Sequence, residues 1–241
     1  GLPHSTLAFD VNLGCSAYPY ALHLLGSMIA SGSVKKGLVL VGDCTSTPND
    51  PLFSDAGTAT AMEFDAHAAP MYFDLNSDGS GYQAIILPVG GHREPTAIEH
   101  LLPHRQDPQA LWRRPLDLIL DGPAVLTFST QRIPPAVEKL LEYAHVSKSQ
   151  VDYFIFHQAN RMINDTLRKK LELPVEKVPS SLRDFGNTSG ASVPLTMTAR
   201  LHEQLESGPH RLLLCGFGIG LSWATCLVDI DGACFPALIE S

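Results

Sequence analysis

The stretch "FDVNLGCSAYPYALHLLGSMIASG" (Phe9–Gly32) decides the fold, because an alternating apolar segment meets an amphipathic helical pattern at Cys15. The alternation predicts a strand over Leu7–Val11. Apolar residues at helical spacing predict a helix over Ser16–Ser31, which ends at Gly32. Two interpretations of Cys15 follow. It is a small apolar residue of the core, or it is a nucleophile at a helix N-terminus, where free N–H groups favour a thiolate.

Composition limits the class of protein. The 241 residues are 44% hydrophobic and 17% charged, which is typical of one large or two small globular domains. A formal net charge of −8 argues against general affinity for nucleic acid. The five cysteines lack CxxC spacing and are odd in number, so we expect neither a zinc site nor a disulfide framework. Cysteine usage of this kind predicts a reducing, cytoplasmic location.

The order of elements after Cys15 occurs twice in the chain. The first predicted helix is followed by two predicted strands, "GLVLVGD" (Gly37–Asp43) and "GTATAMEF" (Gly57–Phe64). A second predicted helix (Ser189–Gly208) is likewise followed by two apolar strands, which are Arg211–Gly218 and Leu221–Ile230. The pattern therefore indicates a duplicated structural unit.

Only the second copy has further elements before it. They are a helix over Ala136–Val146, a strand over Val151–His157 and a helix over Ala159–Leu173. Alternating strands and helices indicate layered α/β structure. We therefore expect an α/β fold whose first repeat is incomplete, with roughly 80–100 residues of it absent from this chain, judged from the size of α/β units. The expected division is 1–114, the remainder of the first half with loop excursions, and 115–241, the second half.

The segment between the two copies, Ala66–Arg114, is rich in Pro, Gly, His and Asp and predicts loops with one short strand over Met71–Leu75. Its histidines are His92, His100 and His104. They lack helical i, i+4 pairing and acidic partners at ligand spacing, so we interpret them as solvated loop residues and expect no metal site.

Three polar residues occupy the ends of predicted α/β units. Cys15 lies at a strand-to-helix junction, His157 ends a strand in "YFIFHQAN", and Asn187 lies before a helix in "FGNTSGAS". Sites of open α/β sheets lie at such ends, and imidazole and amide groups can donate to negative charge on a substrate. Each residue also has a structural interpretation: a buried thiol, a satisfied core histidine, and a turn or helix cap.

Four motifs occur together and in order: "FDVNLGCSAYPYAL", "FHQANRMI", "FGNTSGASVP" and "GFGIGLSWA". Together they resemble the 3-ketoacyl-acyl-carrier-protein synthase III family of thiolase-like condensing enzymes, collinearly from about Ala8 to Ile230. The resemblance implies a thiolase-like duplicated α/β unit with αβαβα layers. It also implies that the chain lacks roughly the first hundred residues of a full member.

The resemblance assigns a role to each motif. Cys15 is expected to take an acyl group from acyl-CoA or an acyl carrier protein as a thioester. His157 and Asn187 are expected to stabilise the enolate that forms when malonyl-acyl carrier protein loses carbon dioxide, and this carbanion attacks the thioester to give a 3-ketoacyl product. The backbone N–H groups of Cys15 and Ile219 are expected to form the oxyanion hole, and Phe217 to wall the pocket.

The resemblance further implies a homodimer with no tightly bound cofactor, whose partners are acyl-CoA and acyl carrier protein. An acidic carrier is expected to dock on Arg168, Lys169 and Lys170, although these residues also fit a solvated helix face. Arg161 is not included, because Met162 occupies the place where the family usually has arginine.

Two alternative functions compete with this one. The order Cys, His, Asn also fits a papain-like cysteine hydrolase, but that family's local cysteine signature is missing and its fold has no repeat of this kind. The incomplete first repeat also fits a non-catalytic or partner subunit of a split condensing enzyme.

Overall fold

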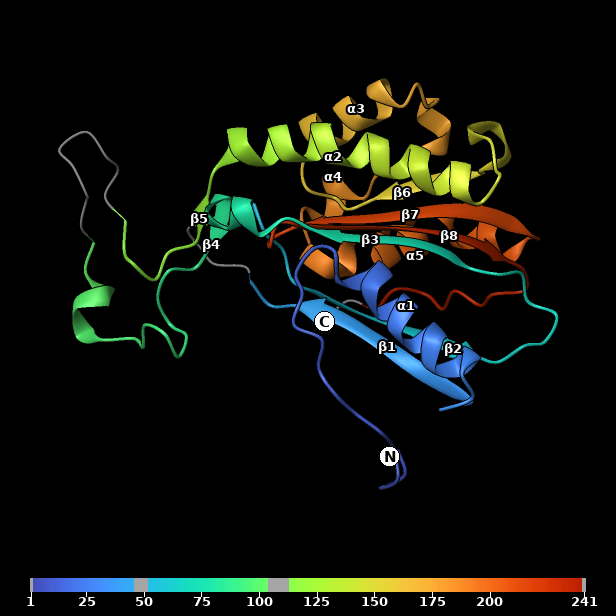
Figure 1. Cartoon of the computed structure of the whole chain (residues 1–241), viewed down its shortest axis with the longest axis horizontal. Helices are drawn as coiled ribbons and strands as arrows, with labels where there is room; N and C mark the ends of the chain where they lie inside the picture. The colour runs from blue at the N-terminus through green and yellow to red at the C-terminus, as the bar shows by residue number, and fades with distance from the viewer. Residues whose placement is uncertain (1, 46–51, 104–112, 240–241) are drawn as a thin grey trace.

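The computed structural model describes residues 2–45, 52–103 and 113–239, and these form four layers (Figure 1). A two-stranded sheet is followed by a layer of helices, a four-stranded sheet and an outer layer of helices. The helices are α1 (Ala17–Ala30), α2 (Gly122–Tyr143), α3 (Arg161–Lys170), α4 (Leu182–Phe185) and α5 (Ser192–Glu206). The strands are β1 (Lys36–Asp43), β2 (Ala56–Glu63), β3 (Tyr72–Ser77), β4 (Ile85–Ile86), β5 (Ile119–Leu120), β6 (Tyr153–Phe156), β7 (His210–Gly218) and β8 (Ser222–Ile230). Short 3₁₀ helices are η1 (Gly79–Ala84), η2 (Ile98–Leu101), η3 (Lys148–Gln150), η4 (Val175–Lys177) and η5 (Ser189–Ala191).

The smaller sheet is one antiparallel pair of strands, and the larger sheet has four strands. β1 and β2 pair antiparallel from Lys36 opposite Glu63 to Asp43 opposite Ala56. The larger sheet has the order β3-β8-β7-β6, in which β6 and β7 are parallel and the other pairs are antiparallel. β4 and β5 form a separate short antiparallel pair.

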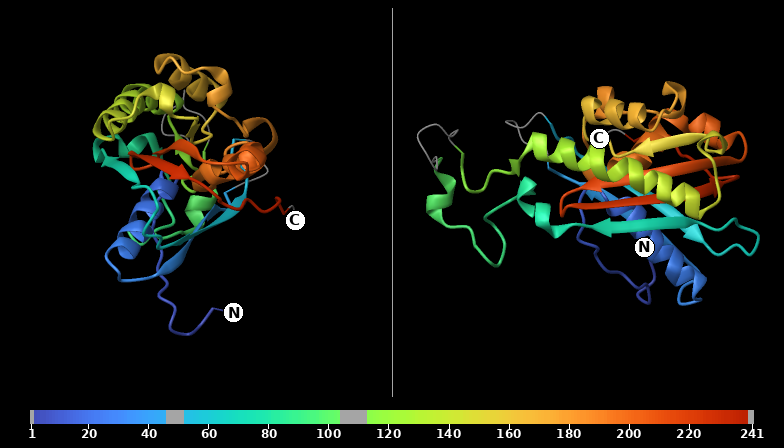
Figure 2. Two further views of the ribbon diagram at one scale, coloured as in Figure 1. Left: turned by 90° about the vertical axis from the view of Figure 1, so that its right-hand side faces the viewer. Right: turned by 45° about the horizontal axis from the view of Figure 1, so that its top comes forward.

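The helices α1 and α5 lie between the two sheets (Figures 1 and 2). Tyr18 and Leu22 of α1 and Val193 and Leu205 of α5 share one hydrophobic cluster with residues of β1 and β7. Because a sheet covers each side of this helix layer, apolar surface on both sides is removed from water. Each Å² of apolar surface buried in this way stabilises the fold by about 25 cal/mol. The N-termini of both helices lie in the same region of the molecule, where β6 and β7 also end.

The duplicated unit predicted from the sequence is confirmed. α1 with β1 and β2 repeats as α5 with β7 and β8, each a helix followed by an antiparallel pair. Gly32 ends the first helix with φ +75°, a conformation that glycine adopts without steric cost.

The outer helix α2 is longer than predicted. The sequence analysis placed a helix over Ala136–Val146, but α2 begins at Gly122 and runs through Pro134 and Pro135. The side chain of Asp121 caps it by accepting from the N–H of Ala124 at 2.9 Å. Packing of α2 against the larger sheet outweighs the hydrogen bonds that the two prolines remove.

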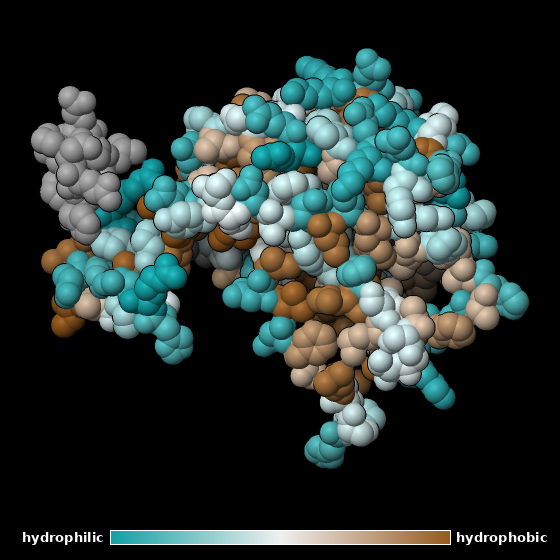
Figure 3. Space-filling view, viewed as in Figure 1, coloured by the Kyte–Doolittle hydropathy of each residue, from teal (hydrophilic) through white to brown (hydrophobic). Residues whose placement is uncertain are grey.

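The prediction of a strand over Leu7–Val11 is wrong. These residues have no regular secondary structure, and Leu7 and Phe9 are 63% and 58% exposed. A strand forms only where a neighbouring strand supplies backbone partners, and no described strand pairs with this segment. Figure 3 shows hydrophobic side chains gathering on the lower part of the front face, in the region of the N-terminal segment and α1.

The expected loop region contains β3, which confirms the short strand predicted over Met71–Leu75. β3 joins the sheet of the second half by pairing with β8, so the two predicted parts share a sheet. The segment around η2 extends away from the layered body (Figure 2). Among the residues described, no helix combines the length and apolar character needed to cross a membrane.

Candidate active site

Cys15 lies just before α1 and packs directly on the end of β7. A Cβ atom added to Gly218 would lie 2.8 Å from the Cys15 Cβ and 3.0 Å from its Sγ. One added to Gly216 would lie 2.8 Å from the Cys15 carbonyl oxygen. On the other side, the hydroxyls of Ser16 and Ser222 hydrogen-bond at 2.7 Å and join the start of α1 to β8. The thiol is therefore held in place by backbone contact that only glycine permits.

The thiol is surrounded by hydrogen-bond donors but is protonated at neutral pH. Burial raises the pKa of Cys15 to about 11. The Ser189 hydroxyl, and the backbone N–H groups of Cys15 and Ile219, lower this pKa but do not offset the burial. The N-terminal position therefore does not make a resting thiolate. The same N–H groups are the two that the resemblance assigns to an oxyanion hole.

His157 continues the line of β6 at the edge where β7 ends. Its backbone N–H donates to the Cys215 carbonyl at 2.7 Å, and its Nδ1 lies 2.7 Å from the Ser192 Oγ. The ring meets Phe217 edge-on, with centroids 5.4 Å apart. Burial lowers the pKa of His157 to about 4, although a backbone hydrogen bond to Ser189 raises it. The imidazole is consequently neutral at pH 7.

Asn187 is oriented by both its side chain and its backbone. Its Oδ1 accepts from the Ser189 N–H at 2.9 Å, and its Nδ2 donates to the Ala159 carbonyl at 3.4 Å. Its carbonyl accepts from the Ser54 N–H at 2.9 Å, beside a parallel bridge to Phe53. The side chain is 5% exposed. The amide is therefore fixed beside Ala159, which lies two residues after His157 in the sequence.

Ser189 connects the three predicted residues, and the sequence analysis did not single it out. Its Oγ lies 3.8 Å from the Cys15 Sγ, its N–H donates to Asn187, and it hydrogen-bonds His157 through its backbone. Its φ of +50° is unusual for a residue with a side chain, and such conformations concentrate at functional sites. The sequence feature that could have identified Ser189 is its position inside the motif "FGNTSGAS".

The other predicted pocket residues lie beside the thiol. Phe217 is fully buried behind the His157 ring. Ile219 is 37% exposed, and its side chain leans over Gly14, the residue before the nucleophile. A Cβ atom on Gly14 would lie 2.6 Å from the Ile219 Cγ2. The Ile219 side chain therefore occupies the space that a side chain at position 14 would need.

The predicted docking residues lie in the last turn of α3, whereas His157 precedes its first turn. Arg168 donates to the Leu173 carbonyl at 3.1 Å, and Lys170 donates to the Thr130 carbonyl at 3.0 Å. Lys169 is exposed. A helix of ten residues is about 15 Å long, so the docking residues lie at the end of α3 that is farther from His157. Docking of a carrier at this turn stays a prediction.

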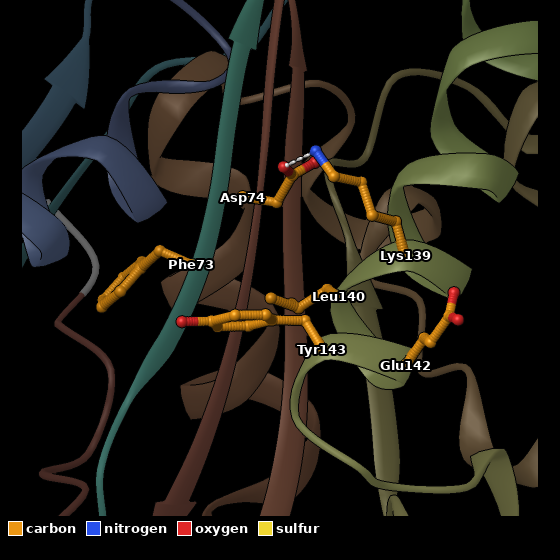
Figure 4. A pocket seen from close by; sticks show the side chains of 6 residues that line it. All are labelled: Phe73, Asp74, Lys139, Leu140, Glu142 and Tyr143. Atoms are coloured by element: carbon orange, nitrogen blue, oxygen red, sulfur yellow. Dashed lines mark hydrogen bonds and ion pairs between the residues drawn. The ribbon is translucent and has the colours of Figure 1, made fainter.

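A separate pocket of about 490 Å³ opens between β3 and α2 (Figure 4). The Asp74 carboxylate and the Lys139 ammonium form an ion pair of 2.6 Å there, and the ring of Tyr143 reaches toward β3. The lining residues include none of the predicted catalytic ones; they are Phe73, Asp74, Lys139, Leu140, Glu142 and Tyr143. The predicted catalytic residues therefore lie outside this pocket.

The described loop histidines, His92 and His100, do not belong to a ligand set. His100 Nδ1 accepts from the Ala97 N–H at 3.0 Å, and its Nε2 lies 3.7 Å from a Glu94 carboxylate oxygen. His104 lies outside the described residues. Within the ranges that the structure describes, no group of three or more His, Cys, Asp or Glu side chains could hold a metal ion.

A thiol, a neutral imidazole and an amide, gathered where two repeated α/β units meet, define a thiolase-like condensing enzyme. Comparison with known proteins agrees. Residues 9–79 match the family model of 3-oxoacyl-acyl-carrier-protein synthase III, and residues 141–230 match the model of its C-terminal part.

Individual relatives extend this similarity over most of the chain. A beta-ketoacyl-acyl-carrier-protein synthase III of Streptococcus agalactiae is 31% identical over 235 residues, which cover 94% of this chain and 69% of the relative. A crystal structure of a 3-oxoacyl-acyl-carrier-protein synthase from Burkholderia xenovorans is 37% identical with a TM-score of 0.91, covering 100% of this chain and 69% of the other. A priming beta-ketosynthase of a polyketide pathway is 27% identical with a TM-score of 0.70, covering 93% and 66%.

The chain belongs to the 3-oxoacyl-acyl-carrier-protein synthase III family. It is thus an acyltransferase of the condensing type, and the papain-like alternative is wrong. The chain spans about two thirds of the length of the relatives that it matches.

Proposed function

We propose that this protein forms a 3-ketoacyl thioester by decarboxylative condensation of an acyl group held on Cys15 with malonyl-acyl carrier protein. The observation that carries the proposal is the set of donors around the thiol. The backbone N–H groups of Cys15 and Ile219 hydrogen-bond the Cys15 sulfur. Ser189 contacts Cys15 and hydrogen-bonds both His157 and Asn187, so it links their neutral side chains to the thiol.

In the first half-reaction, the Cys15 sulfur attacks the carbonyl carbon of an acyl-CoA. A new C–S bond forms, the bond to the CoA sulfur breaks, and the departing thiolate takes up the proton lost by Cys15. The N–H groups of Cys15 and Ile219 stabilise the oxyanion of the tetrahedral intermediate. Because burial raises the pKa of the thiol to about 11, the resting thiol is protonated at neutral pH and loses its proton in the course of acylation.

In the second half-reaction, malonyl thioester loses carbon dioxide, and the electron pair of the broken C–C bond moves onto the thioester as an enolate. His157 and Asn187 donate hydrogen bonds to the enolate oxygen. A pKa of about 4 makes His157 a poor base at pH 7, but it leaves the neutral ring able to donate. The carbanion then attacks the Cys15 thioester, a C–C bond forms, and the Cys15 sulfur leaves as a thiolate that takes up a proton from water.

We further propose that the substrates are acyl-CoA and an acyl carrier protein, with the carrier docked by Arg168, Lys169 and Lys170. The exposed ammonium of Lys169 supports this, because a carrier protein is acidic. The variant Lys169→Glu is expected to weaken reaction with malonyl-acyl carrier protein and to leave acylation by acyl-CoA unchanged. Loss of both in parallel contradicts docking at this turn. A homodimer in the cytoplasm, without a tightly bound cofactor and working in fatty acid synthesis, completes the proposal.

The two half-reactions separate the proposed roles. Cys15→Ala is expected to abolish the acyl-enzyme, which intact-mass measurement detects. His157→Ala and Asn187→Ala are expected to keep most of the acylation and to lose release of carbon dioxide from malonyl thioester. Equal loss of both half-reactions in Asn187→Ala refutes the role given to the amide. A wild-type protein that binds both substrates without reacting supports the alternative of a non-catalytic partner subunit.

A further inference from the structure

A buried serine, Ser192, holds the imidazole of His157 and has no part in the steps above. Ser192 is the first residue of α5, and His157 follows β6, 35 residues earlier in the chain. Its Oγ lies 2.7 Å from the Nδ1 of the ring, and the serine is fully buried. The short distance shows a hydrogen bond between the two side chains.

The second partner of Ser192 favours one direction for this hydrogen bond. The backbone N–H of Gln158 donates to the same Oγ at 3.3 Å. The hydroxyl therefore accepts once, and its own proton needs an acceptor. Among the described residues, the side-chain atom that the hydroxyl proton of Ser192 can reach is the Nδ1 of His157, and the ring has a further hydrogen bond to the backbone of Ser189. If the hydroxyl donates to Nδ1, that nitrogen carries no proton.

The neighbours of Ser192 fix it in this arrangement. The Thr196 hydroxyl donates to the Ser192 carbonyl at 2.7 Å and also contacts the Ser181 hydroxyl at 2.8 Å. On the opposite side of the ring, Phe217 meets the imidazole edge-on at 84°. A buried network with satisfied members is rigid, so the ring orientation is determined before a substrate binds.

We propose that Ser192 is a positioning residue that holds neutral His157 with its proton on Nε2. The Nε2–H is then the group that donates to the thioester oxygen of the malonyl substrate as it becomes an enolate. The opposite tautomer would place a lone pair on Nε2 and repel that oxygen. This inference rests on the proposed function for its chemical meaning, but the tautomer itself is a property of the resting protein.

The first experiment measures the tautomer without any substrate. In protein labelled with ¹⁵N-histidine, long-range ¹H–¹⁵N spectra at pH 7 distinguish protonated from unprotonated ring nitrogens, and the spectrum of His157→Ala identifies the His157 signals. The expected result is a neutral ring with a protonated Nε2 and an unprotonated Nδ1. A protonated Nδ1 overturns the proposal, whether or not the protein condenses acyl groups.

The second experiment removes the hydroxyl. Ser192→Ala is expected to lower kcat for malonyl decarboxylation by about 10- to 100-fold, by analogy with the loss of a partner that orients a metal-bound histidine. KM and the rate of Cys15 acylation are expected to stay close to wild type. Ser129→Ala is the matched control, because Ser129 is also fully buried in a helix and donates to the Val125 carbonyl of its own helix.

The outcomes separate the two proposals. Unchanged decarboxylation in Ser192→Ala overturns the positioning role. Equal losses in Ser192→Ala and Ser129→Ala overturn it too, because they show a general effect of removing a buried hydroxyl. Absence of decarboxylation in the wild type overturns the proposed function, while the NMR measurement still decides the tautomer.

Discussion

The contact between Gly14 and Ile219 predicts a specific rescue. Gly14→Ala places a Cβ atom 2.6 Å from the Ile219 Cγ2, whereas ordinary van der Waals contact begins at 3.4 Å. The overlap is therefore 0.8 Å, from 3.4 minus 2.6. The β-branched side chain of Ile219 is stiff at χ1 and cannot turn away freely. Overpacking of this kind is expected to lower the free energy of unfolding by about 1–3 kcal/mol.

Ile219→Ala removes the clashing methyl group and keeps a side chain whose Cβ lies 3.9 Å from the new atom. Alone, it is expected to cost about 1 kcal/mol, because Ile219 is partly exposed. The double variant Gly14→Ala/Ile219→Ala is expected to be more stable than the sum of the single variants predicts, by about 1–3 kcal/mol. Guanidinium unfolding measures all four proteins of this cycle.

The same cycle has a functional readout. Displacement of Ile219 moves its backbone N–H away from the Cys15 sulfur, so Gly14→Ala is expected to slow acylation of Cys15, and the double variant to recover it. Additive free energies, within about 0.5 kcal/mol, would refute the packing of Ile219 over Gly14. Coupled stability without recovery of acylation would refute the role of the Ile219 N–H.

Two further predictions follow from the buried titratable groups. The pKa of His157 falls from 6.5 to about 4 because the ring is buried, so between these values the unfolded chain binds more protons than the folded chain. The contribution of His157 to stability is therefore complete above about pH 6.5 and is lost as the pH falls toward 4, by roughly 3 kcal/mol in total. Urea unfolding at several pH values is expected to show that the free energy of unfolding depends less on pH in His157→Asn than in the wild type. An equal pH dependence in the two proteins contradicts the burial of the imidazole. Cys15, with a pKa of about 11, is expected to react with iodoacetamide more slowly at pH 8 than exposed Cys44 and Cys234, and to gain rate up to about pH 11. Peptide mapping by mass spectrometry measures that order, and fastest labelling at Cys15 contradicts it.

Local periodicity predicted most of the helices and strands, and long-range contacts account for the errors. The repeated helix and strand pair was visible because each element carries its own 3.6- or 2-residue pattern. The prediction missed the start of α2, which runs through Pro134 and Pro135 because the helix packs on the larger sheet, and local sequence contains no information about that packing. Leu7–Val11 has the alternation of a strand but no paired neighbour among the described strands, and alternation alone contains no information about partners.

The candidate site shows the same division. Cys15, His157 and Asn187 were identified from motifs, because the residue types and their order are local properties of the sequence. Ser189 and Ser192 were not, although both lie inside a quoted motif. Their contacts with Cys15 and His157 span 174 and 35 residues, and such contacts become visible only after folding.

Intact-mass measurement after incubation with acyl-CoA tests the central claim most directly, because every later step depends on a thioester at Cys15. A panel of acyl-CoAs of different chain length supplies the acyl groups, and peptide mapping locates the adduct. The account predicts a mass increase of one acyl group on the peptide that contains Cys15, absent from Cys15→Ala. An unmodified wild-type protein across the whole panel, or an adduct that persists in Cys15→Ala, would contradict it.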